Sequence, residues 1–89
     1  MTPWQLALAS SAERTLARLP DRVAAAVVEF LVDPLLEAPE KVGKPLRYEL
    51  EGYWSARRGA YRIVYRLDLK AHPVRVVRIE HRSDVYRPR

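Results

Sequence analysis

The residues best suited to bind an anion lie on a predicted β-hairpin in the second half of this 89-residue chain. Apolar and polar side chains alternate along residues 53–67 on both sides of Gly59-Ala60. This two-residue loop suits a tight hairpin with glycine at its first central position. This register collects apolar side chains on one face and places Arg57 directly opposite Arg62 on the other. Like charges facing each other across an antiparallel pair are destabilising, so the arrangement favours an anion between the two guanidinium groups.

Two interpretations of this arginine pair stay open. Guanidinium groups hold phosphate through two parallel hydrogen bonds and keep their proton near neutral pH, so the pair would suit a clamp for a phosphodiester. Alternatively, each arginine forms an ion pair with a neighbouring carboxylate, for which Glu80 and Asp84 are available. Both interpretations depend on the register, because a slip of one residue would move one arginine to the other face.

A second group of ionisable residues follows the last predicted strand, over residues 81–86 (HRSDVY). His81 could give or take a proton because the reference pKa of histidine is about 6.5. Tyr86 could do so if nearby cations lower the pKa of its phenol from about 10. His72 lies in a predicted turn and is expected to be inert.

The composition excludes several classes of chemistry. The chain has no cysteine and two histidines, which excludes disulfide bonds, thiol nucleophiles and the usual metal-ligand sets. Neither a nucleophilic serine motif nor a glycine-rich phosphate loop is present, so no cofactor is expected. No apolar run approaches the roughly 20 residues of a membrane span, and no signal-peptide pattern is found, so we expect a cytoplasmic protein.

Charge is distributed unevenly along the chain, whose net charge is +5. Residues 1–40 carry three basic and six acidic residues, whereas residues 41–89 carry thirteen basic and five acidic ones. A basic half of one small domain is typical of a protein that binds a polyanion. The alternative is a solvated face with surplus arginines.

Hydrophobic periodicity predicts the elements that position these groups. Residues 4–9 alternate as a short strand, and the Ser-x-x-Glu box that starts at Ser10 opens a helix to about Leu19. Asp21 is a suitable N-cap for a second helix with a broad apolar stripe, which runs to about Val32.

The rest of the chain predicts strands. Residues 37–51 are expected to form a loop, with a helical turn around Leu35. Three strand signals follow, at residues 52–58, 61–67 and 74–81. The order strand–helix–helix–strand–strand–strand predicts one α+β domain over residues 1–89, with two N-terminal helices on one face of a small antiparallel-type sheet.

Four segments in this order resemble the RelE/ParE superfamily of toxins from bacterial toxin–antitoxin pairs. They are residues 43–46 (GKPL), 50–59 (LEGYWSARRG), 61–65 (YRIVY) and 81–86 (HRSDVY). The length and the predicted order of elements also match over nearly the whole chain. The closing His-Arg-x-x-x-Tyr pattern is closer to the RelE side, whose members cleave mRNA in the ribosomal A site, than to the ParE side, whose members poison DNA gyrase.

The resemblance implies a metal-independent endoribonuclease with a fold like that of microbial RNases. In its reaction the ribose 2′-OH attacks the adjacent 3′-phosphate, leaving a 2′,3′-cyclic phosphate and a free 5′-OH. By position, Arg62 matches the family's principal phosphate-stabilising arginine, and Arg57 lies where a second basic side chain is usual. Tyr86 matches the tyrosine that stacks on a base or assists proton transfer, while His81 and Arg82 fall where other members place basic or acid–base groups.

The resemblance also implies further contacts to RNA and leaves the general base open. The basic residues expected to contact phosphates or ribosomal RNA are Lys44, Arg47, Arg58, Arg66, Arg75 and Arg78. Well-known members carry lysines in the first hairpin strand, one of them the proposed general base, where this chain has Tyr53 and Ser55. The base is therefore open between His81 and Tyr86, and so is ribosome dependence.

Family members are neutralised by a cognate antitoxin, which implies a small, acidic and partly disordered partner that covers the basic half. The other expected partners are mRNA and the ribosome, and no association with a membrane is expected. Two further functions stay open. One is gyrase inhibition without nuclease chemistry, and the other is a degenerate member that only binds its antitoxin.

Overall fold

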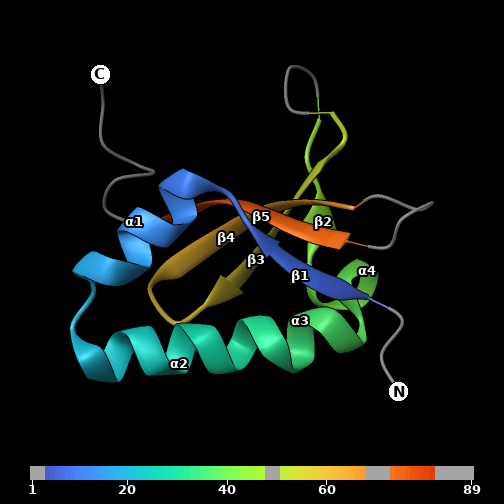
Figure 1. Ribbon diagram of the computed structural model, residues 1–89. Coiled ribbons are helices and arrows are strands. Elements are labelled where there is room, and N and C mark those ends of the chain that lie inside the picture. The colour runs from blue at the N-terminus through green and yellow to red at the C-terminus, as the bar shows by residue number, and fades with distance from the viewer. Residues whose placement is uncertain (1–3, 48–50, 68–72, 82–89) are drawn as a thin grey trace.

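The computed structural model of the protein describes residues 4–47, 51–67 and 73–81. Its elements follow in the order β1 (Gln5–Leu8), α1 (Ser10–Arg18), α2 (Asp21–Val32), α3 (Pro34–Glu37), α4 (Pro39–Val42), β2 (Lys44–Pro45), β3 (Tyr53–Arg58), β4 (Tyr61–Leu67) and β5 (Pro73–His81). The strands form a sheet in the order β1-β5-β4-β3-β2, and the helices precede all strands but β1 (Figure 1). This arrangement confirms the predicted α+β fold.

The strands β3 and β4 form the predicted hairpin. Gly59 opens the loop with a φ of 61°, a left-handed conformation that glycine adopts without steric cost. The register pairs Arg57 with Arg62 and Ala56 with Ile63, as the sequence predicts. Because Ala56 and Ile63 are buried, the alternation turns the arginine pair to the other face of the sheet.

The strand β5 lies inside the sheet, between β4 and β1. It pairs antiparallel with β4, and the register shifts between Val64 and Tyr65, which leaves Val77 as an extra residue on β5. The strand β1 runs parallel to β5, with Leu8 beside Val76. The sheet is therefore mixed, and the expectation of an antiparallel-type sheet holds for β2 to β5 only.

One hydrophobic core joins the helices to the inner face of the sheet. The helix α2 lies along one side of the strands (Figure 1) and buries Val27, Phe30 and Leu31. The predicted apolar stripe is confirmed only in part, at Val27 and Leu31, because it also included Val28 and Val32, which are exposed, and did not include Phe30. The buried core residues are Ala12, Val27, Phe30, Leu31, Leu35, Ala56, Ile63, Tyr65, Val74, Val76 and Ile79. The helices thereby leave the opposite face of β2 to β5 for other contacts.

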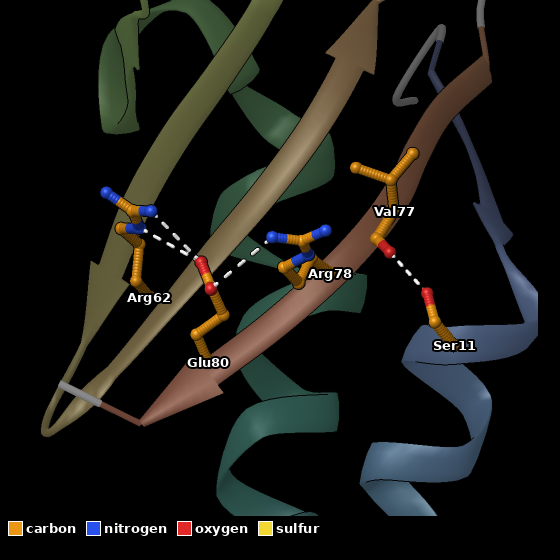
Figure 2. A network of polar contacts seen from close by, with 5 residues as sticks. All are labelled: Ser11, Arg62, Val77, Arg78 and Glu80. Atoms are coloured by element: carbon orange, nitrogen blue, oxygen red, sulfur yellow. Dashed lines mark hydrogen bonds and ion pairs between the residues drawn. The ribbon is translucent and has the colours of Figure 1, made fainter. Parts of the chain in front are cut away.

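The structure corrects both predicted helix starts. The helix α1 begins at Ser10 itself, with Ala9 as N-cap and no side-chain capping bond, so the predicted capping box is wrong. Likewise, Asp21 is the first residue of α2 rather than its N-cap. The hydroxyl of Ser11 instead donates a hydrogen bond of 2.6 Å to the carbonyl of Val77, which fastens α1 to the bulge in β5 (Figure 2).

The segment predicted as a loop, residues 37–51, holds α4 and β2. The helical turn predicted around Leu35 is present as α3. The Tyr65 hydroxyl donates a hydrogen bond of 2.6 Å to the Pro39 carbonyl, and burial raises the pKa of Tyr65 to about 12. A Cβ on Gly43 would overlap this same hydroxyl. These contacts fix the segment against β4 and so place β2 at the sheet edge.

Candidate functional site

The strands β2 to β5 gather basic side chains on the face turned away from the helices. Residues opposite each other across paired strands share a face. Three cross-strand rows result, namely Tyr53–Arg66–Arg75, Lys44–Ser55–Val64–Arg78 and Arg57–Arg62–Glu80. We call this surface the basic face and define it by Lys44, Arg57, Arg62, Arg66, Arg75 and Arg78.

The row of Arg57, Arg62 and Glu80 lies nearest to the hairpin loop. Arg62 donates from Nε at 3.3 Å and from Nη2 at 3.0 Å to Oε1 of Glu80. The two side chains are 30% and 15% exposed, so water screens this ion pair only partly. For Arg62, the ion pair that the sequence left open is thus present, with Glu80 as its acceptor (Figure 2).

Two more arginines shape the basic face around this row. Arg78 is 66% exposed, and its Nη1 lies 3.7 Å from Oε2 of Glu80. The guanidinium of Arg66 lies over the ring of Tyr53, 5.0 Å from the ring centroid. Stacking of this kind orients a guanidinium while its in-plane N–H groups stay available to an acceptor.

Two predicted site residues, Arg58 and His81, lie on the opposite face. Both are cross-strand neighbours of Tyr61, and the ring of His81 packs edge-on against it with 5.2 Å between centroids. Arg58 and Tyr61 line a groove of about 300 Å³ together with Arg22 and apolar residues of α2. The structure therefore brings neither Arg58 nor His81 into the basic face.

The remaining predicted residues flank the strands. Arg47 is exposed and directly follows Leu46, whose N–H donates a hydrogen bond of 2.8 Å to the carbonyl of Tyr53. Arg47 thus lies in the chain beside the start of β3. Arg82, Tyr86 and Asp84 lie outside the described residues.

Arg22 lines the groove beside Arg58 and Tyr61, and the sequence alone did not indicate it as a candidate site residue. It shares the groove with Ala26, its neighbour one helical turn later on α2. The spacing of four residues is the signal that could have placed both on the face of α2 that meets the hairpin loop.

The described residues offer a limited set of chemical groups. Within them, no three His, Cys, Asp or Glu side chains gather as metal ligands would. Of the helices described, none is both long and apolar enough to cross a membrane. The basic face combines guanidinium and ammonium groups with one carboxylate, which suits the binding of a phosphodiester beside a group that can accept a proton.

Comparison of the sequence with known proteins gives consistent matches. A family model described as the ParE toxin of type II toxin–antitoxin systems, parDE, matches residues 6–86. Toxin RelE of Mycobacterium tuberculosis is 51% identical, and the alignment covers 96% of this chain and 88% of the relative. Toxin RelG of the same organism is 48% identical, with coverages of 96% and 98%.

Comparison of the folds agrees with the sequence matches. A chain of the toxin–antitoxin complex RelBE2 from Mycobacterium tuberculosis has a TM-score of 0.86 and 48% identity, covering 90% of this chain and 99% of that one. The intact RelBE toxin–antitoxin complex of E. coli contains a chain with a TM-score of 0.74 and 21% identity, with coverages of 88% and 95%. At that lower identity the likeness concerns the fold alone.

Proposed function

The chain belongs to the RelE/ParE family of toxins from type II toxin–antitoxin systems, as its sequence motifs indicated, and we propose that it cleaves mRNA. The proposed reaction is metal-independent attack of a ribose 2′-OH on the adjacent phosphate, in the ribosomal A site. The protein would accordingly act in the cytoplasm.

The observation that supports this proposal most directly is the row of Arg57, Arg62 and Glu80. Arg62 already binds a carboxylate, an anion whose two oxygens resemble those of a phosphodiester. Its two arginines lie on the neighbouring strands β3 and β4, which hold both guanidinium groups more rigidly than loops would. Donors fixed before the reaction stabilise the negative charge that develops on the phosphate, because they need not reorganise.

The other rows would guide the RNA backbone to this point. Lys44, Arg66, Arg75 and Arg78 extend the positive charge of the basic face over neighbouring strands spaced about 4.8 Å apart. Contacts to phosphates position a nucleic acid without reading its sequence. Arg82 and Tyr86 keep their proposed roles near the cleaved bond through the family resemblance alone.

We further propose a cognate antitoxin as a partner. The solved relatives named above are toxin–antitoxin complexes, and the one from Mycobacterium tuberculosis shares 48% identity with this chain. An acidic segment of the antitoxin would neutralise the basic face by competing with RNA phosphates for the same arginines.

Induced expression in bacterial cells, followed by mapping of mRNA 5′ ends, tests the nuclease function. The wild-type chain should arrest growth and produce cuts within coding regions, in register with codons. Arg62→Ala should lower cleavage by about 10²–10³-fold, because it removes the principal donor to the phosphate. Arg18→Ala, at an exposed position on α1, is the matched control and should cleave like the wild type.

Two other outcomes would contradict the proposal. Growth arrest with intact mRNA would move the search for a target to DNA gyrase. Wild-type expression without any arrest would indicate a degenerate member that only binds its antitoxin.

A further inference from the structure

Glu80 is the one carboxylate on any strand that the structure describes, and it lies within the basic face. A carboxylate repels a phosphate, so Glu80 does not itself contribute to phosphate binding, although it offsets the repulsion between Arg57 and Arg62. At 15% exposure, Glu80 lies close enough to these arginines to meet a phosphate bound by them, so a role in the reaction can be considered beside its ion pair.

The contacts of Glu80 leave room for a substrate on the same arginine. Oε1 accepts both hydrogen bonds from Arg62, whereas Oε2 lies 3.7 Å from Arg78, beyond hydrogen-bond length. A guanidinium has five N–H donors, of which Arg62 uses two for Glu80. Arg62 can thus bind Glu80 and a phosphate at the same time and hold them side by side.

Position decides which group could take a proton from the substrate. A general base must come within about 2.6–3.2 Å of the proton's oxygen. In RNA the attacking 2′-OH is next to the phosphate that Arg62 would hold, and hence on the side of the sheet that carries Glu80. His81, the adjacent residue on β5, contacts Tyr61 on the opposite face.

We propose, on the basis of the nuclease function proposed above, that Glu80 is the general base of the cleavage. Its carboxylate takes the proton of the 2′-OH, and an electron pair of the 2′-oxygen forms the new O2′–P bond. The P–O5′ bond breaks, and the 5′-oxygen keeps its electron pair and takes a proton from water. Arg62 stabilises the charge on the phosphate oxygens, and Glu80 then returns its proton to water.

Single-turnover cleavage of mRNA on purified ribosomes, at saturating toxin, tests the role of Glu80. Glu80→Gln keeps an oxygen that can accept from Arg62 but loses the basicity. It should cleave about 10²–10³-fold more slowly than the wild type while it binds programmed ribosomes at least as tightly. The matched control is Glu29→Gln, at an exposed carboxylate on α2, which should cleave at the wild-type rate.

A second variant separates chemistry from folding. In Glu80→Ala, added formate should restore part of the cleavage in a concentration-dependent way, because a small carboxylate can occupy the empty position. A misfolded variant would not respond to formate, and the loss of the ion pair alone is tested by Glu80→Gln, which keeps an acceptor for Arg62.

The outcomes distinguish this proposal from the one on which it rests. Cleavage by wild type together with undiminished or faster cleavage by Glu80→Gln would overturn the role of Glu80 alone. The faster result would mark Glu80 as a competitor of the phosphate for Arg62. Ribosome-bound wild-type toxin that leaves the mRNA intact would overturn both proposals.

Discussion

Arg57 and Arg62 share a hairpin because a third strand brings a carboxylate to the same row. Without Glu80, two like charges would face each other across β3 and β4 at a cost in stability. The ion pair with Arg62 is only partly screened and contributes on the order of 1 kcal/mol. The positive charge that a polyanion requires is therefore compatible with a stable hairpin.

Tyr65 gives a residue-scale prediction about the pH dependence of stability. Its pKa is about 12 in the folded protein against 10.0 ordinarily, because burial disfavours the phenolate. The stabilisation by the neutral phenol is complete below pH 10 and is lost as the pH rises towards 12. Tyr65→Phe should flatten this loss in urea-unfolding experiments. At neutral pH it should destabilise the fold by about 1–3 kcal/mol, since the Pro39 carbonyl loses its donor.

Two checks accompany that prediction. Tyr53→Phe, at a half-buried position on β3, should keep the loss of stability above pH 10. An unchanged pH profile in Tyr65→Phe would show that the Tyr65 phenol does not control alkaline unfolding.

At the scale of elements, the placement of β2 depends on how closely α4 and β4 approach each other. Gly43 has ordinary extended backbone angles, so space rather than conformation requires glycine there. Gly43→Ala would push a methyl group into the Tyr65 hydroxyl and should cost about 1–3 kcal/mol in thermal or urea unfolding. In a Tyr65→Phe background the penalty should shrink, because the overlapped oxygen is gone. Equal penalties in both backgrounds would contradict this account.

Elements whose neighbours are close in sequence could be predicted from the sequence. The hairpin register follows from Gly59-Ala60 and the alternation around it, and the structure has the same pairs. The parallel pairing of β1 with β5 could not be predicted, since no local pattern records which distant strand lies beside β1. The predicted start of α1 was wrong by one residue. The hydrogen bond from the Ser11 hydroxyl to Val77, a partner 66 residues away, could likewise not be predicted from local sequence.

The part of the candidate site that lies on one hairpin could be predicted, because that pairing is local in sequence. Alternation along β3 and β4 is enough to place Arg57 and Arg62 on one face. Whether Glu80 or Asp84 would pair with them depends on the register of β5, which a bulge shifts between Val64 and Tyr65. Because the register of β5 was unknown, the sequence also could not show that His81 lies on the face opposite the arginines.

At the scale of the whole molecule, folding turns an uneven sequence charge into one surface. Six basic side chains gather on the basic face, so RNA affinity should fall with salt as counterions return to the phosphates. For single-stranded RNA with a 2′-deoxy position at the cleavage point, Arg75→Ala should reduce the slope of log affinity against log salt by about 0.7.

Arg18→Ala on α1 serves as the control for this titration and should keep the wild-type slope. If Arg75→Ala kept the wild-type slope as well, the row of Tyr53, Arg66 and Arg75 would not contact the RNA backbone.

The parallel pairing of β1 with β5 also sets the order of events during synthesis. A nascent chain emerges from the ribosome N-terminus first. The strand β1 therefore emerges early, but it can pair only after β5, the last strand described, has been made. Contacts between such distant segments form late, because a long loop must close first. Since Glu80 and Arg78 arrive on β5, a nascent chain has no finished site while most of it is being made. A nascent chain therefore completes the basic face only once β5 has been made and has joined the sheet.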